Sequence, residues 1–197
     1  MKIIKDNSYD IVRLLVNQIG ITIFAMMLYT AANVVEDEAL GNGVILAVSI
    51  FSILFYLFLL YTAAWDLGAK DKIRIDSGRM EACPYKGAVI ALFANIPNLV
   101  IATASVATLG IFMASAVDGF YSAFAVLNLI MRLFMSMYLG VIQAACVAFK
   151  DSHNLYFFLQ SIGYLVAPVL PILATHFGYR MGLAERKLFG NSKPKGA

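Results

Sequence analysis

Seven polar side chains that could bind a small solute lie within otherwise apolar stretches of this chain. These candidate ligand-binding residues are Asn95, Asn98, Asn128, Arg132, Ser136, Gln143 and Gln160. Lipid offers no hydrogen-bonding partner, so such groups must be satisfied by protein, water or a ligand. Arg132 is the most informative of them, because its planar, permanently charged donor fork matches a carboxylate or a phosphate.

Arg132 belongs to a polar stripe on the fourth apolar segment. On a straight helix the stripe falls within about 40° of one line and comprises Tyr121, Asn128, Arg132, Ser136, Gln143, Cys146 and Lys150. We expect this face to point into a helical bundle. Two roles for Arg132 stay open, a ligand or gating contact and an anchor at the outer interface. The anchor follows from the spacing, since Lys150 is 18 residues away, about 27 Å along a helix.

A second polar cluster, Asn95-Ile96-Pro97-Asn98, lies in the third segment. Pro97 lacks a backbone N–H and frees the carbonyl of Phe93, so we predict a kink flanked by two amides. One interpretation is a binding place for a solute or cation. The other is hydrogen bonding across a packed helix seam, worth about 0.6 kcal/mol per bond in membranes.

Catalytic and cofactor motifs are lacking. The two histidines, His153 and His176, and the two cysteines, Cys83 and Cys146, lie in no metal-ligand or redox motif. No nucleophile elbow, phosphate-binding glycine loop or dinucleotide pattern occurs. The acidic run at 36–38 has the chemistry of a divalent-ion site, but a solvated loop is the commoner role. We therefore expect no enzyme, no cofactor, no metal and no nucleic-acid partner.

The composition indicates which elements position these residues. Of 197 residues, 61% are hydrophobic and 14% charged, whereas a soluble domain has about 45–50% apolar and about 25% charged residues. This excludes an ordinary soluble enzyme and indicates a polytopic membrane protein. Five stretches, which contain no charge except Arg132, are long enough to span a bilayer: 14–35, 43–65, 87–117, 119–149 and 155–179.

We predict an all-α fold, a polytopic integral membrane helical bundle forming one transmembrane domain over residues 1–197. A loop at 66–86 and a mobile tail at 189–197 complete it. Within that loop, alternation at 73–75 and a turn at 76–78 suit a small hairpin. Lys and Arg gather in the N-terminal lead, in this loop and at Lys150, and are missing from the loops between. The positive-inside rule therefore predicts a cytoplasmic (inner) membrane location with a cytoplasmic N-terminus.

The basic C-terminal tail fits five complete spans poorly, because it would then lie outside the cell. Gly163, Pro168 and Pro171 interrupt helical hydrogen bonding in the last segment. That segment either crosses fully or enters and returns as a re-entrant hairpin. Gly178 and Gly182 form a pair of small residues four positions apart, which permits close helix approach.

Two function classes fit these features. The first is a small integral membrane transporter or permease component that binds a polar or anionic small solute in an intramembrane cavity. The alternative is a non-catalytic assembly or regulatory subunit of a larger membrane complex. A connected polar cavity favours the first, and dry packing with an apolar outer seam favours the second. The expected partners are the lipid bilayer, other membrane subunits and the solute.

Overall fold

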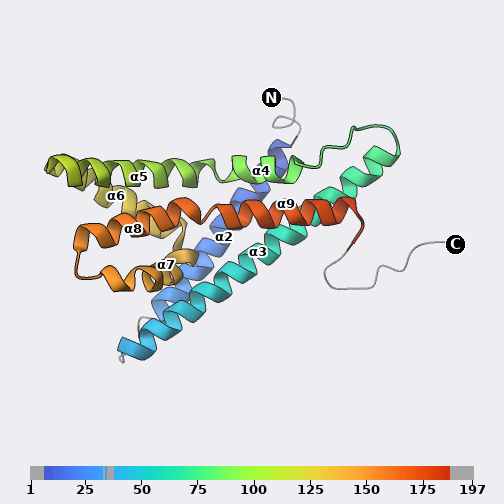
Figure 1. Cartoon of the computed structure of the whole chain (residues 1–197). Coiled ribbons are helices and arrows are strands. Elements are labelled where there is room, and N and C mark those ends of the chain that lie inside the picture. The colour runs from blue at the N-terminus through green and yellow to red at the C-terminus, as the bar shows by residue number, and fades with distance from the viewer. Residues whose placement is uncertain (1–6, 33, 35–37, 187–197) are drawn as a thin grey trace. The chain divides into compact units, whose positions relative to one another are not determined.

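The computed structural model describes residues 7–32, 34 and 38–186, and these residues form helices, turns and short connections. The predicted tail at 189–197 and most of the acidic run at 36–38 lie outside this range. Figure 1 shows the helices, which are α2 (Ser8–Ala32), α3 (Glu38–Asp76), α4 (Lys86–Ala94), α5 (Ile96–Ser115), α6 (Asp118–Phe134), α7 (Leu139–Cys146), α8 (His153–Val166) and α9 (Val169–Leu183). Two short 3-10 turns, Ser136–Tyr138 and Val147–Phe149, flank α7.

Four helical stretches of the described chain are long and apolar enough to cross a membrane: Ser8–Ala32, Leu40–Asp76, Ile96–Ser115 and His153–Leu183. The predicted class, a helical membrane bundle, is confirmed. A fifth candidate consists of α6 together with Ser136–Phe149, but these two parts are bent by 86°. The sharp bend therefore falls in the fourth apolar segment, whereas the sequence had pointed to the last one.

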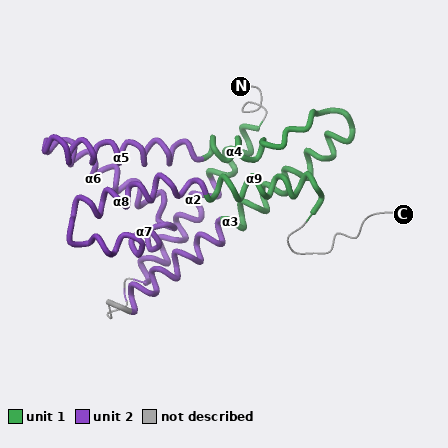
Figure 2. The backbone as a smooth tube through the Cα atoms, in the orientation of Figure 1, with its two compact units in different colours: residues 1–15, 57–94, 170–197 green, residues 16–56, 95–169 purple. Residues whose placement is uncertain are grey.

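The chain divides into two compact units, coloured separately in Figure 2. Unit 1 comprises residues 1–15, 57–94 and 170–197, and unit 2 comprises residues 16–56 and 95–169. Charge is distributed unequally between them. All Lys and Arg residues belong to unit 1 except Arg132 and Lys150, which belong to unit 2.

The helix α3 continues beyond its apolar part, which corrects the predicted loop at 66–86. Residues 66–76 are helical, and the hairpin predicted around 73–78 is wrong. Ion pairs one turn apart stabilise this charged end: Asp66 with Lys70 and Lys72 with Asp76, both at 2.7 Å. The helix stops where Gly78 takes φ +69°, a conformation that favours glycine.

Glycines allow α3 and α9 to pack backbone against backbone in unit 1. A Cβ added at Gly182 would lie 2.2 Å from the Trp65 carbonyl oxygen, and one at Gly178 would lie 2.5 Å from the Tyr61 carbonyl oxygen. From the other side, a Cβ at Gly68 would meet the α9 backbone at 2.3 Å. The predicted role of Gly178 and Gly182 in close helix approach is thereby confirmed.

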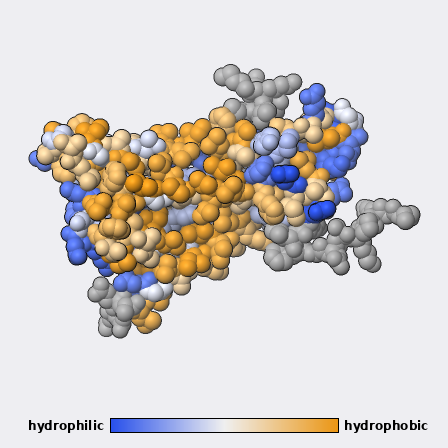
Figure 3. All heavy atoms as spheres, viewed as in Figure 1, coloured by the Kyte–Doolittle hydropathy of each residue, from blue (hydrophilic) through white to orange (hydrophobic). Residues whose placement is uncertain are grey.

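Unit 2 buries both small and large side chains between its helices and leaves other large aliphatic side chains exposed on its outside. Ala102 and Leu109 of α5 are fully buried, and Ser105 meets Ser161 of α8 at 3.2 Å between hydroxyl oxygens. Val100 and Leu129 remain about 60% exposed, as lipid-facing residues do. Figure 3 shows an almost continuous apolar surface along α5 and α8, and hydrophilic residues around the loop that follows α3.

Candidate functional site: a bent helix pair and the cavity beside it

The fourth apolar segment is a broken helix. The α6 helix ends at Phe134, a single 3-10 turn follows, and α7 begins at Leu139 in a direction changed by 86°. The segment contains no proline, so its own sequence did not reveal the break. The predicted straight stripe from Tyr121 to Lys150 is therefore wrong, because its two halves lie on different helices.

Neighbouring helices satisfy the backbone groups that the break releases. The Thr22 hydroxyl donates to the Phe134 carbonyl oxygen at 2.8 Å, and the Ser136 hydroxyl donates to the Thr22 carbonyl oxygen at 2.9 Å. The Gly140 N–H donates to the Ser49 hydroxyl at 2.8 Å. A Cβ at Gly140 would lie 2.5 Å from the Ile45 carbonyl oxygen, so glycine is required here. Broken backbone at membrane depth is tolerated only where such partners cover it.

The hydrogen bond from the Gly140 N–H to the Ser49 hydroxyl predicts a loss of stability for Ser49→Ala. Removing the hydroxyl leaves the buried Gly140 N–H without a partner, which costs about 1–3 kcal/mol. The matched control is Ser52→Ala, one turn further along α3, because the Ser52 hydroxyl is buried and has no hydrogen-bond partner. We expect that control to be neutral or slightly stabilising. Thermal unfolding of the purified variants measures the stability of each. Equal losses in Ser49→Ala and Ser52→Ala would contradict a stabilising role for the hydrogen bond to Ser49.

The two ends of the broken segment meet at the same end of unit 2. The Tyr121 hydroxyl of α6 lies 3.3 Å from Nε2 of His153, the first residue of α8. Tyr121 also contacts Phe112 near the end of α5, with ring centroids 5.0 Å apart. The chain thus leaves this end at α6, turns at the bend, and returns to it before α8.

A cavity of about 510 Å³ lies beside the returning arm in unit 2. Residues of α2, α3, α7 and α8 line it, together with the turn after α7. They are Tyr29, Asn42, Gly43, Ile45, Leu46, Gly140, Gln143, Ala144, Val147, Lys150 and Tyr156. Among the described residues of this lining, Lys150 alone is charged. Asn42 and Gly43 come from the first turns of α3, which places Lys150 beside that end of the helix.

Arg132 does not line this cavity and is held by neutral partners on α8. Its Nη2 donates to Oε1 of Gln160 at 3.3 Å, and its guanidinium carbon lies 5.7 Å from the centre of the Phe157 ring. Tyr156, which lines the cavity, interacts with both Arg132 and Gln160. Arg132 Nε and the Tyr164 hydroxyl are buried without a hydrogen-bond partner.

The structure distributes the seven predicted residues over several places. Gln143 lines the cavity, Arg132 and Gln160 bind each other beside it, and Ser136 holds the bend. Asn128 is buried one turn before Arg132, and its Oδ1 has no partner. Asn98 donates to Asn95 at 3.2 Å, beside the break between α4 and α5 that the sequence predicted at Pro97. The bend prevents one cavity lined by all seven.

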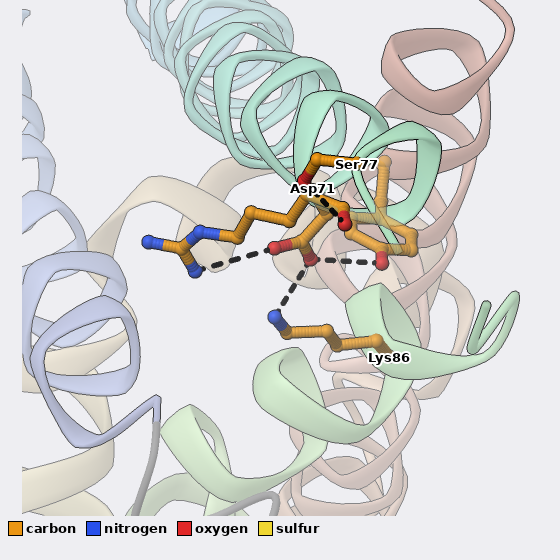
Figure 4. A network of polar contacts seen from close by, with 5 residues as sticks. Asp71, Ser77 and Lys86 are labelled. Atoms are coloured by element: carbon orange, nitrogen blue, oxygen red, sulfur yellow. Dashed lines mark hydrogen bonds and ion pairs between the residues drawn. The ribbon is translucent and has the colours of Figure 1, made fainter. Parts of the chain in front are cut away.

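Unit 1 contains a buried charge network that the sequence did not suggest. Asp71 is completely buried and accepts from the Lys86 ammonium at 2.6 Å and from the Tyr179 hydroxyl at 3.0 Å. Figure 4 shows the Lys86 ammonium pointing at the Asp71 carboxylate. Arg74 lies 3.7 Å from the second carboxylate oxygen. The sequence places both Asp71 and Lys86 in the predicted loop at 66–86. Continuing the helical spacing of the buried face of α3 as far as Asp71 would have revealed the carboxylate.

Comparison of the chain with protein-family models, curated proteins and solved structures finds no match. Among residues 7–32, 34 and 38–186, no group of three or more His, Cys, Asp or Glu side chains is placed to hold a metal ion. The functional argument therefore depends on the bent helix pair, its cavity and the charges around them.

Proposed function

We propose that this protein is a small integral membrane transporter or permease component that binds a polar or anionic small solute in the cavity of unit 2. The cavity beside the broken helix is the observation that carries the proposal. Its volume of about 510 Å³ falls within the range of about 300–1,000 Å³ that is usual for small-molecule sites. Interrupted helices are a recurring feature of solute sites in membrane transporters.

The charge distribution supports an anionic solute. Of the two cations of unit 2, Lys150 lines the cavity, and Arg132 interacts with Tyr156, which also lines it. The ion pairs found among the described residues all belong to unit 1, and neither Arg132 nor Lys150 takes part in one. A cation within a membrane is costly unless an anion or a wet cavity compensates it. A bound anion would supply that compensation.

We also propose a membrane topology of four crossings with a re-entrant fourth segment. The contact between Tyr121 and His153 supports it, since both ends of the segment lie together. Counting crossings then places the N-terminus, the loop after α3 and the basic tail on one side, with Lys150 on the other. The positive-inside rule assigns the first side to the cytoplasm of a cell whose inner membrane holds the protein. This topology removes the difficulty that five spans created for the tail.

A specific observation favours the second candidate, a non-catalytic subunit of a larger membrane complex. Phe24 of α2 and Phe51 and Phe55 of α3 form an exposed aromatic cluster with ring centroids 6.1–6.5 Å apart. Such a rigid apolar patch suits a partner helix as well as lipid chains. Under this alternative, gently extracted protein carries a partner subunit in constant ratio and no small molecule.

Filling the cavity tests the proposal. Nothing lies within 4 Å of a Cβ at Gly43 or at Gly119, so both positions accept a side chain, but Gly43 lines the cavity and Gly119 does not. We expect native mass spectrometry of gently extracted protein to show a bound small molecule in the wild type and in Gly119→Phe. Gly43→Phe should lose it while remaining folded. A wild-type protein without any bound small molecule, but with a constant partner subunit, would overturn the proposal.

A further inference from the structure

We infer that the solute is an amphipathic monoanion whose anionic group pairs with Lys150 and whose apolar body lies against Ile45 and Leu46. This inference rests on the proposed function and names the chemical class of the solute. All three residues line the cavity of about 510 Å³ in unit 2. A ligand in this cavity therefore meets a positive charge and an apolar wall at the same time.

The cavity lies at the level of the boundary between membrane and water. Asn42 directly precedes the apolar stretch 43–65, and Lys150 directly follows the stretch 119–149; both residues line the cavity. Tyr156, an amphipathic side chain of the type that is enriched at this boundary, lines it as well. A cavity at this level is accessible to solutes from water and to the headgroups of lipids.

The lining changes from polar to apolar over one helical turn on both sides of the cavity. On α3, Ile45 and Leu46 follow Asn42 by about one turn and lie inside the apolar stretch. In the turn after α7, Val147 precedes Lys150 by three residues. Small-molecule sites combine an apolar lining with a few polar groups that fix orientation. This lining therefore suits a ligand with one polar end and an apolar body.

Lys150 determines the charge of the polar end. Among the ion pairs of the described residues none includes Lys150, so its ammonium can accept an anionic partner. The Asn42 amide supplies a further pair of donors from the facing helix. With a single cation among the described lining residues, one negative charge is compensated and a second would lack a partner.

The apolar wall must supply most of the affinity. Lys150 is exposed, and an ion pair with an exposed cation contributes little by itself. Each methylene group that leaves water strengthens binding about fourfold. A small inorganic anion should therefore bind weakly here, and an anion with an aliphatic body should bind well. Two sources can provide such an anion, a water-soluble organic acid and an anionic membrane lipid.

The test measures thermal unfolding of the full-length protein in phosphatidylcholine nanodiscs with hexanoate, acetate and neutral hexanamide. We expect hexanoate to raise Tm saturably and to bind at least about 10-fold more tightly than acetate. Hexanamide should bind at least about 3-fold more weakly than hexanoate, because it lacks the charge. Replacing part of the phosphatidylcholine by phosphatidylglycerol distinguishes the sources. Weaker hexanoate binding then identifies a competing lipid, and unchanged binding identifies a water-soluble acid.

Lys150→Glu should weaken hexanoate binding at least about 10-fold, because attraction is replaced by repulsion. Its unliganded Tm should stay the same, since Lys150 is exposed and no ion pair is lost. Lys150→Arg keeps the charge and should restore binding. The matched control is Lys70→Glu, because Lys70 is also exposed but belongs to unit 1 and does not line the cavity. This control should bind hexanoate as the wild type does.

Equal hexanoate affinities of Lys150→Glu and Lys70→Glu would overturn the inference, as would equal affinities for hexanoate and acetate or no protection by hexanoate. Hexanoate binding that persists in Gly43→Phe would also overturn it, because the anion would then bind outside the cavity. A neutral solute found by native mass spectrometry in the wild type and lost in Gly43→Phe would overturn the inference while leaving the proposed function intact.

Discussion

Replacing Asp71 by alanine is expected to destabilise the protein by about 3–5 kcal/mol, because breaking a buried ion pair leaves an uncompensated buried charge. Asp71 is fully buried, and the Lys86 side chain is only 6% exposed. The carboxylate also accepts a hydrogen bond from the Tyr179 hydroxyl. The network therefore joins residues of α3, α4 and α9 within unit 1. Thermal or denaturant unfolding of the purified variant measures the loss.

Asp66→Ala is the matched control for this prediction. Asp66 lies on the same helix and forms an ion pair with Lys70 at 2.7 Å, close to the 2.6 Å between Asp71 and Lys86. Its side chain, however, is 44% exposed. Exposed ion pairs contribute about 0–1 kcal/mol, so the control should lose little. In the double variant Asp71→Leu with Lys86→Met, much of the stability should return, since no unpaired charge remains. Equal losses for Asp71→Ala and Asp66→Ala would contradict this role.

Adding one methyl group at Gly182 should cost about 1–3 kcal/mol, the usual range for overpacking. The added Cβ would lie 2.2 Å from the Trp65 carbonyl oxygen and 3.0 Å from the Ala69 nitrogen. Both atoms belong to the backbone of α3, so no flexible side chain can move aside. The helices α3 and α9 must separate to accept Gly182→Ala.

Gly20→Ala provides the comparison for this effect. Gly20 lies inside α2, and nothing lies within 4 Å of its added Cβ. Alanine favours a helix over glycine by about 1 kcal/mol, so this variant should be unchanged or slightly more stable. The unfolding midpoint should fall for Gly182→Ala and should stay the same or rise for Gly20→Ala. Loss of stability in both, to the same extent, would show that the close approach of α3 and α9 is unimportant.

The fold class could be predicted from the sequence, because apolar length and charge avoidance are properties of single segments. The long third segment indicated a kink at Pro97, and Gly178 with Gly182 indicated a close helix contact. The break after Phe134 could not be predicted. Its stability comes from Thr22 and Ser49, residues more than 80 positions away in the chain, and the segment itself contains no proline.

The candidate site was only partly predictable for the same reason. Arg132 and Gln160 were identified separately as unusual polar residues, and the structure brings them together. The sequence offered no means of finding the cavity, since a straight fourth helix would carry Lys150 away from Asn42. Asp71 and Lys86 were missed because charged residues beyond an apolar stretch resemble a solvated loop. Tyr179, which donates to the Asp71 carboxylate, lies 108 positions later in the chain, so this burial is a tertiary effect.

The central claim, that the fourth segment enters and returns on one side of the membrane, is tested most directly by the accessibility of a cysteine at Ser152. The measurement uses a chain in which Cys83 and Cys146 are serine and a maleimide reagent that does not cross the membrane. Single cysteines at Ser77 and Ser192 mark the loop after α3 and the tail. The proposed topology predicts labelling from outside at Ser152, and protection at Ser77 and Ser192. Labelling of Ser152 from the same side as Ser77 would contradict it, because the fourth segment would then cross the membrane completely.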